Sequence, residues 1–468
     1  MKEINITDLF FLEIIISFLI IGLSFIKIYL LKNYTLSQNK TFQSLNKKET
    51  PYFYSTYFSK KNEFNKIFRL KNSNHINLYI SSLKNINKSS PQILKQIKKS
   101  PNNYKLLLLY ANITLLLNDR ISFQHTLSKI KLPFFAPLLL KANYLYLKSH
   151  NDLYNTDMYS ASKNCSKSLT IYQKKKASYE TALCYLTLAQ TYRISGVYDV
   201  AFSMLKEAKK IFEKLSLHQK YSEVIAYFGL TELGRGNFEV ANQYFNQALE
   251  ITKKHKLNKT SSDINNWLGL SLYSKEDIKQ AKLIFQNITK SEHSSILSLG
   301  FAFEMLARIA LKNKNYKLAL KYVNCALNNY NKTSQSSGIF ENLYLKADIY
   351  YNTLQYSKSK EILISLIKQK TSFSTTYYIA NAYTLLGLIY LNENNLNLAK
   401  TTFKQALDLE NSKNRLKGAL IDYNNLAETS FRLGDEKQAK EYLNLALSCS
   451  QKIEDKELEN YIKSKLKD

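Results

Sequence analysis

Apolar and small residues recur at steps of three and four along most of this 468-residue chain, and they do so in paired segments. The clearest pair spans residues 382–409, where Tyr383, Gly387 and Tyr390 share one helical face. Residues 393–395, Glu-Asn-Asn, interrupt the pattern with turn-forming side chains. A second amphipathic stretch follows, with small and aromatic residues on one face: Ala399, Phe403 and Ala406. The pattern predicts two helices packed through small side chains.

The pair recurs in register along the chain. With Gly387 taken as the eighth position of its unit, each unit has Gly or Ala there: Ala189, Gly229, Gly269, Ala307, Ala347, Gly387 and Ala427. Twelve positions later each unit has another small residue: Ala201, Ala241, Ala281, Ala319, Ser359, Ala399 and Ala439. Successive units are 40 residues apart, except for one step of 38. Because one hairpin cannot bury its own apolar stripe, the repetition predicts a solenoid of stacked helix pairs.

Weaker units flank the seven clear ones, which occupy residues 176–453. Residues 101–175 are predicted to be degenerate helical repeats. Their first unit fits the register through four residues: Ala111, Phe123, Leu127 and Ile130. The second, residues 138–175, fits only with a lengthened inner turn around residues 150–156. The polar segment 454–468 is predicted to be a C-terminal capping helix.

Residues 9–31 form a separate, largely apolar stretch of 23 residues. This length is enough to cross roughly 30 Å of hydrocarbon, so residues 1–31 are predicted to be a transmembrane anchor. The alternatives are a cleaved signal peptide, against which Glu3 and Asp8 argue, and a buried helix. More lysines follow the span than precede it, so the positive-inside rule predicts a single-pass membrane protein with its repeats on the cytoplasmic side.

Residues 32–100 carry a large share of the positive charge, with 13 lysines and one arginine against two glutamates. This composition is typical of a partly disordered basic linker next to a membrane. The same charges are suited to anionic lipid headgroups or, as a less favoured alternative, to the phosphates of nucleic acid. No helix-turn-helix or zinc-finger pattern accompanies them.

Composition narrows the chemistry further. The formal net charge is +29, which indicates an anionic partner surface or only a Lys-rich and Asn-rich composition. The four cysteines form no C-x-x-C pair, and the six histidines show no metal-ligand spacing. Phosphate-binding loops and nucleophile-elbow motifs are absent from the sequence. We therefore predict no enzymatic activity, no cofactor and no metal.

The repeat pattern resembles the tetratricopeptide repeat family, from the Leu-Gly or Leu-Ala pair of the first helix to the final small residue of the second. The usual period of that family is about 34 residues, so the chain is most similar to its longer repeats, such as those of kinesin light chain and some bacterial regulators. Residues 423–427, Tyr-Asn-Asn-Leu-Ala, are similar to the kinesin light chain type. The resemblance implies an all-α, right-handed superhelical solenoid of antiparallel helix pairs, preceded here by the single transmembrane helix.

The resemblance also implies a concave groove lined by positions two, five, nine and twelve of each first helix. The predicted groove residues at these positions are Glu223, Asp263, Asn266, Glu304, Arg308, Glu341, Tyr344, Asp348, Tyr351, Asn381, Asn424 and Glu428. Further apolar and aromatic residues at these positions are Tyr273, Leu388 and Phe431. The polar members are mostly acidic, which favours a basic peptide, and the asparagines can both donate to and accept from a peptide backbone. The alternative is an ordinary solvated face.

These observations predict a membrane-anchored scaffold that binds a protein or peptide partner in its concave groove without catalysis. One alternative is a regulatory module that contacts nucleic acid or anionic lipid through residues 32–100. Another is an envelope or export assembly factor, if the repeats are extracytoplasmic.

Overall fold

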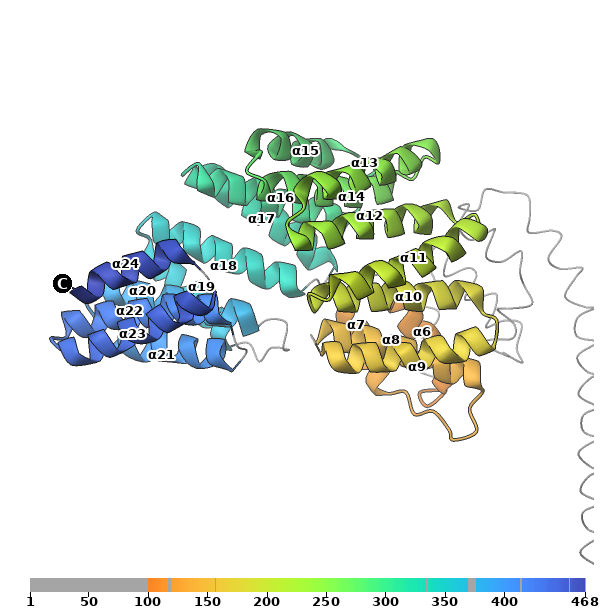
Figure 1. The fold of residues 1–468 in the computed structure, drawn as a ribbon, viewed down its shortest axis with the longest axis horizontal. Helices are drawn as coiled ribbons and strands as arrows, with labels where there is room; N and C mark the ends of the chain where they lie inside the picture. The colour runs from red at the N-terminus through yellow and green to blue at the C-terminus, as the bar shows by residue number, and fades with distance from the viewer. Residues whose placement is uncertain are drawn as a thin grey trace, which may run out of the picture. The chain divides into compact units, whose positions relative to one another are not determined.

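The computed structural model describes residues 100–116, 119–155, 157–333, 336–368, 376–412, 415–453 and 455–467. Within these ranges the chain forms nineteen helices and no strand, and the helices follow one another as antiparallel pairs (Figure 1). The predicted all-α helical repeat solenoid is therefore confirmed for the part of the chain that the structure describes.

Each pair has a first and a second helix. The first helices are α6 (Tyr104–Leu116), α8 (Leu138–Tyr154), α10 (Ser178–Ile194), α12 (His218–Arg235), α14 (Asn258–Ser274), α16 (Ile296–Lys312), α18 (Ser336–Asn352), α20 (Thr376–Asn392) and α22 (Leu416–Arg432). The second helices are α7 (Arg120–Ser128), α9 (Met158–Lys174), α11 (Tyr198–Lys214), α13 (Phe238–Lys254), α15 (Ile278–Lys290), α17 (Tyr316–Thr333), α19 (Tyr356–Lys368), α21 (Leu396–Asn411) and α23 (Glu436–Lys452). A last helix, α24 (Lys456–Lys467), follows the ninth pair.

The turn inside each pair repeats a single backbone feature. One residue with positive φ lies between the first and second helix of seven pairs: Gly196, Gly236, Glu276, Lys314, Leu354, Asn394 and Gly434. In the pair α20–α21, Asn394 has φ 59°, and the N–H of Asn395 donates to the carbonyl of Tyr390 at 2.8 Å. This left-handed residue ends the helix and satisfies one of its free carbonyl groups. The turns therefore end successive first helices at equivalent positions.

Small residues let the two helices of a pair approach closely. A Cβ atom added to Gly229 would lie 2.7 Å from Cε1 of Phe245, and one added to Gly387 would lie 2.6 Å from Cε1 of Phe403. Both rings are fully buried. The ring of the second helix thus fills the space that the missing side chain of the first helix leaves.

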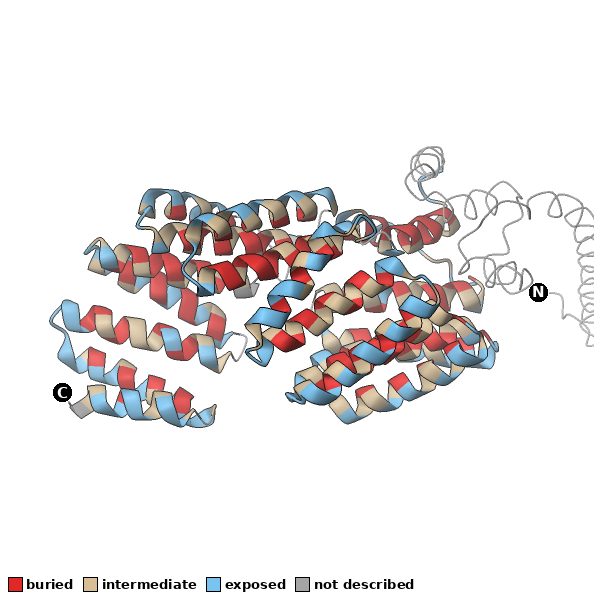
Figure 2. Cartoon of the chain, turned by 90° about the horizontal axis from the view of Figure 1, so that it is seen from above, coloured by how far each residue is buried: buried red, intermediate tan, exposed pale blue. Residues whose placement is uncertain are grey.

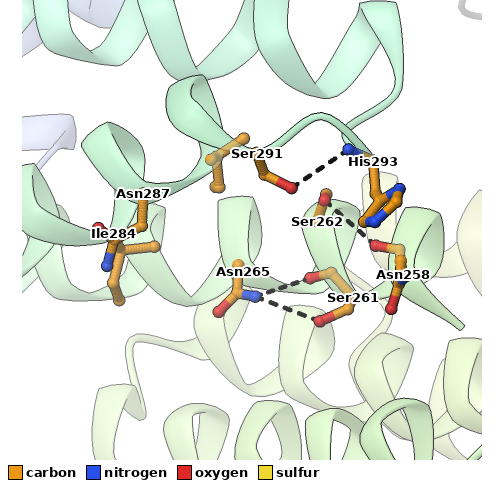
Figure 3. Close-up of a pocket in the computed structure, with 9 residues that line it drawn as sticks. Asn258, Ser261, Ser262, Asn265, Ile284, Asn287, Ser291 and His293 are labelled. Atoms are coloured by element: carbon orange, nitrogen blue, oxygen red, sulfur yellow. Dashed lines mark hydrogen bonds between the residues drawn. The ribbon is translucent and has the colours of Figure 1, made fainter. Parts of the chain in front are cut away.

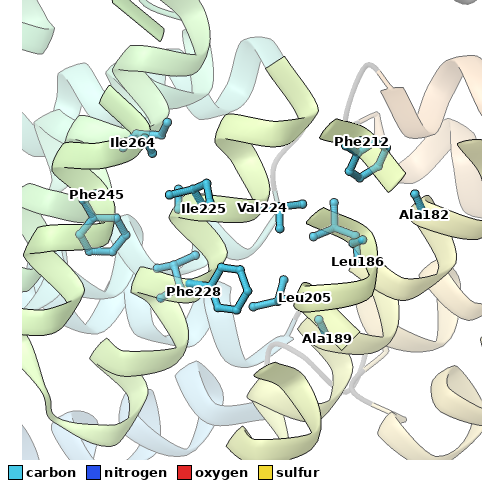
Figure 4. Close-up of a cluster of buried hydrophobic side chains, with 14 of the residues drawn as sticks. Ala182, Leu186, Ala189, Leu205, Phe212, Val224, Ile225, Phe228, Phe245 and Ile264 are labelled. Carbon is cyan, nitrogen blue, oxygen red and sulfur yellow. The ribbon is translucent and has the colours of Figure 1, made fainter. Parts of the chain in front are cut away.

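The buried apolar side chains form a core that continues from pair to pair. One cluster runs from α10 to α14 and includes Leu186, Leu205, Phe228 and Ile264 (Figure 4). Buried residues lie along the faces that the helices turn to one another, and exposed residues lie along the outer edges (Figure 2). Burial therefore follows the helical period seen in the sequence.

The first helices form a continuous side of the stack. Each of α10, α12, α14, α16, α18 and α20 packs against its own second helix and also against the next first helix. Among the described helices, successive second helices do not pack against each other to that extent. We call the surface at positions two, five, nine and twelve of the first helices the first-helix face.

The N-terminal units are more regular than the sequence indicates. Helix α8 ends at Tyr154 and α9 begins at Met158, so this pair needs no lengthened inner turn. Three buried residues, Ser149, Ala161 and Cys165, lie 40 positions before Ala189, Ala201 and Leu205. The register of the seven clear units thus extends to α8 and α9.

The predicted single-pass membrane location has to be corrected. No helix among the described ranges is both long enough and apolar enough to cross a membrane. The longest of them, α12 and α17, have 18 residues and carry charged side chains along their length. The predicted anchor and nearly all of the basic linker, residues 1–99, lie outside the described residues.

The close packing predicts how one core substitution behaves. Ala399 is fully buried between α20 and α21, so Ala399→Leu should overpack this pair and lower the free energy of unfolding by roughly 1–3 kcal/mol. Urea unfolding followed by circular dichroism measures the change. Leu398 is 54% exposed on the same turn, so Leu398→Ala is the matched control and should change stability by less than about 0.5 kcal/mol. Equal stabilities of the two variants would contradict this account of the packing.

Candidate functional site

Arg308 lies between two carboxylates on the first-helix face. Its guanidinium donates to Oε1 of Glu341 on α18, and its Nε lies 3.5 Å from Oε1 of Glu304 on its own helix α16. The other carboxylate oxygen of Glu341 accepts a hydrogen bond from the hydroxyl of Tyr378 on α20. These contacts join three successive first helices.

Glu304 is the buried member of this group, with 4% of its surface exposed. Its Oε2 accepts from the hydroxyl of Tyr330 at 3.1 Å and from Nδ2 of Asn342 at 2.9 Å. Burial, followed by the charge of Glu341, raises the pKa of Glu304 to about 7, although Arg308 opposes the shift. Near neutral pH this carboxyl is therefore divided between its charged and neutral forms.

Asp348 lies one helical turn beyond Tyr344 on the same side of α18. Burial raises the pKa of Asp348, while a hydrogen bond from Asn352 and the charge of Arg308 lower it. The bond from Asn352 comes from the same helix, at 2.9 Å to Oδ1. Tyr351 follows Asp348 on this side, so the carboxylate lies between two tyrosines along one helical face.

Seven of these residues, from α16, α17, α18 and α20, are named the Arg308 cluster. They are Glu304, Arg308, Tyr330, Glu341, Asn342, Asp348 and Tyr378. With both of its other carboxyls ionised, the cluster holds one fixed positive charge against two or three negative ones, depending on the protonation of Glu304. It is an acidic site on a strongly basic chain.

Other predicted groove residues are engaged in contacts between or within helices. Asp263 accepts a hydrogen bond from the hydroxyl of Ser298, and Nδ2 of Asn266 donates to the carbonyl of Ser298 at 3.0 Å. Both contacts link α14 to α16. Glu223 pairs with Lys220 of its own helix, with Nζ 2.6 Å from Oε2. These three residues contribute to packing and are less available to a ligand.

The remaining predicted residues lie near the C-terminal end of the solenoid. Glu428 pairs with Arg432 of the same helix at 2.9 Å. Asn424 is half-buried, and its Oδ1 has no hydrogen-bond partner among the described residues. Asn381 is also half-buried, while Leu388 packs against the apolar core. The structure thus brings four of the twelve predicted residues into the cluster and places Tyr344 and Tyr351 beside it.

Three members of the cluster were not predicted from the sequence. Tyr330 belongs to a second helix, and Asn342 and Tyr378 fall outside the four groove positions. The sequence contains one signal for Tyr330, the glycines at positions 300 and 338. In the structure, Cβ atoms added to Gly300 and Gly338 would lie 2.9 Å and 2.8 Å from the Tyr330 ring. Two glycines near the starts of neighbouring first helices thus mark where this ring enters.

A separate pocket of about 290 Å³ lies between α14, α15 and the loop after α15 (Figure 3). Helix α15 has 13 residues, whereas α13 has 17, so the loop replaces its last turn. The pocket is lined by Asn258, Ser261, Ser262, Asn265, Ile284, Asn287, Ile288, Ser291 and His293. It contains none of the predicted groove residues. The side-chain amide of Asn265 already donates to the carbonyl and the hydroxyl of Ser261. The pocket is therefore distinct from the first-helix face.

The next feature is the set of side chains that could bind a metal or undergo redox chemistry. The described residues contain no group of three or more His, Cys, Asp or Glu side chains that could hold a metal ion. Cys165, Cys184 and Cys449 are buried free thiols, and Cys325 is half-buried. Burial raises the pKa of Cys184 well above its ordinary value, which makes this thiol a poor nucleophile.

Comparison with known proteins agrees with the helix-pair architecture. Residues 380–413 and 423–452 match the tetratricopeptide repeat model. These segments cover the last two helix pairs, α20–α21 and α22–α23. No curated relative matches the chain.

Several solved structures are similar in fold. A signal transduction ATPase from Pyrococcus horikoshii with a tetratricopeptide repeat sensor is 17% identical, with a TM-score of 0.51 over 77% of this chain and 55% of that one. The apo quorum sensor NprR from B. thuringiensis is 14% identical, with a TM-score of 0.49 over 73% of this chain and 97% of that one. A Rap protein complexed with Competence and Sporulation Factor is 15% identical, with a TM-score of 0.47 over 86% of this chain and 98% of that one. At these identities the likeness concerns the fold alone.

The raised pKa of Glu304 predicts a pH dependence of stability. The folded protein holds this proton up to about pH 7, whereas the ordinary pKa is 4.5, so between these values the folded state binds more protons than the unfolded state. The contribution of Glu304 is therefore favourable below pH 4.5 and is lost as the pH rises through 7. Glu304→Gln has the size of the protonated carboxyl but does not titrate. In this variant the free energy of unfolding should therefore decrease less steeply between pH 4.5 and pH 7. The exposed Glu361→Gln is the control, and identical slopes for the two variants would refute the assignment.

Proposed function

We propose that this chain is a non-catalytic binding protein that holds a basic peptide or protein segment against its first-helix face, at the Arg308 cluster. The observation that carries the proposal is the sign of the cluster: acidic groups outnumber the single arginine on a chain of net charge +29. A solvated face of such a chain would follow the overall sign. This face opposes it, which favours a cationic ligand.

Asp348 is the proposed anchor for the ligand's cation. Both carboxylate oxygens of Glu341 already have partners in Arg308 and Tyr378. The hydrogen bond that Asp348 accepts from Asn352 comes from its own helix and occupies one oxygen. A lysine or arginine side chain of the ligand would pair with the other oxygen, with Tyr344 and Tyr351 offering ring faces to the same cation.

The ligand lies along several first helices in this proposal. Because successive first helices pack together, their outward side chains form a row across the stack. Asn381 and Asn424 lie further along this row and would hold the ligand's backbone with their side-chain amides. The seventeen-residue helices of most pairs support our assignment of the repeats to the longer variety of the tetratricopeptide repeat, with its right-handed superhelix.

A charge reversal at the anchor tests this proposal. Asp348→Lys should weaken binding of a synthetic Lys/Arg-rich peptide at least tenfold, equivalent to about 1.4 kcal/mol, because it replaces an attraction by a repulsion. Fluorescence anisotropy with the labelled peptide measures the dissociation constant, and a Glu-substituted peptide of equal length sets the background. Asp408 is exposed on second helix α21, so Asp408→Lys makes the same change in net charge away from the face.

Two results separate site binding from general electrostatics. Equal losses in Asp348→Lys and Asp408→Lys would show that only net charge matters, and would overturn the assignment of the site. A loss confined to Asp348→Lys, with an unchanged thermal unfolding midpoint, is the expected outcome.

A further inference from the structure

The turn before α8 exposes two adjacent phenylalanines. Phe134 is 95% exposed and Phe135 is 85% exposed, the highest values among the large apolar side chains of the described residues. The N–H of Ala136 donates to the carbonyl of Pro133 at 2.9 Å and closes a β-turn with the two phenylalanines at its centre. We call residues 133–136 the Phe turn. The loop that carries it projects beyond the helix pairs (Figure 1).

The Phe turn is held in place on both sides. Ile130 before it and Ala136 within it are each only 5% exposed, so both are anchored in the core. Nζ of Lys141 on α8 donates to the carbonyl of Phe134 at 2.6 Å. Pro137 then caps α8. The two rings are therefore presented on a fixed backbone, which lowers the entropic cost of docking them.

The surroundings of the Phe turn are basic. Lys129 and Lys131 are exposed just before it, and Lys141 follows it. No Asp or Glu occurs from residue 120 to residue 151. The surface that complements this turn is apolar or aromatic and carries carboxylates.

The chain has such a surface in the first-helix face, where Glu341 and Asp348 lie beside Tyr344 and Tyr351. We propose that the Phe turn of one copy docks onto the Arg308 cluster of a second copy, with its lysines toward the carboxylates and its rings toward the tyrosines. This inference rests on the proposed function and names a ligand for it, a lysine-flanked aromatic turn of the chain itself. Because the two surfaces differ, the contact is head-to-tail: the copy that docks its turn keeps a free face, and the copy that receives it keeps a free turn.

Sedimentation velocity of the full chain over a concentration series tests the self-association. The weight-average mass should rise with concentration, and added salt should suppress the rise because charge pairs contribute. Phe134→Ala/Phe135→Ala should weaken the association at least tenfold, as expected when two central aromatic anchors are removed. Leu283→Ala/Leu398→Ala is the matched control, since it removes exposed apolar side chains from second helices α15 and α21 and should associate like the unaltered chain.

A mixing experiment tests the pairing of the two surfaces. The Phe134→Ala/Phe135→Ala chain keeps its acidic face, and the Asp348→Lys chain keeps its Phe turn. Each alone should stay monomeric, whereas an equal mixture should form a one-to-one complex. A mixture that stays monomeric, or an unaltered chain that is monomeric at every concentration, would overturn the inference.

The outcomes also separate this inference from the proposed function. If the unaltered chain binds the Lys/Arg-rich peptide but does not self-associate, only the self-docking fails. If it does not bind that peptide, the proposed function fails as well. Phe-dependent binding to phosphatidylserine vesicles by a chain that stays monomeric would show that a lipid surface occupies the turn and would also overturn the inference.

Discussion

The structure depends on one contact inside each helix pair, between a small residue of the first helix and a side chain of the second helix that fills its place. Where the small residue is Gly229, Gly269 or Gly387, the partner is a phenylalanine sixteen positions later, and no Cβ would fit between them. This contact sets the distance between the two helices. Since it recurs in register, it also gives successive pairs the same shape, so that they can stack.

Polar contacts between successive first helices also determine how neighbouring helix pairs join. Asp263 and Asn266 bind Ser298 of the following first helix, and Thr384 donates to Asp422 of the next, at 2.8 Å. These side chains stand at or beside the positions that the resemblance assigns to ligands. In this chain many such positions therefore join neighbouring units, and a position in the register does not by itself make a ligand contact.

The packing residues could be predicted from sequence because their role depends on volume at a fixed spacing. That held for Ala399 and Phe403. It failed for Ser149 because that position requires small size and not apolar character, and for Cys165 because the smaller cysteine stands where the clear units have a larger apolar side chain. The Arg308 cluster was harder to predict. Its contacts between helices join residues 26 to 38 positions apart, and Tyr330 enters from a second helix, so the spacing of polar residues does not mark it. Four of its seven members were nevertheless in the predicted set.

The ion pairs of the cluster explain where a ligand can bind. Removing charges from water is costly, and Arg308 offsets part of that cost by facing both Glu304 and Glu341. A ligand cation that displaced Arg308 would leave this partly buried guanidinium without a carboxylate partner. Binding is therefore favoured beside the pair and not within it, which directs the ligand to Asp348. The ion pair thus holds α16 and α18 together and leaves a neighbouring carboxylate to recognise the partner.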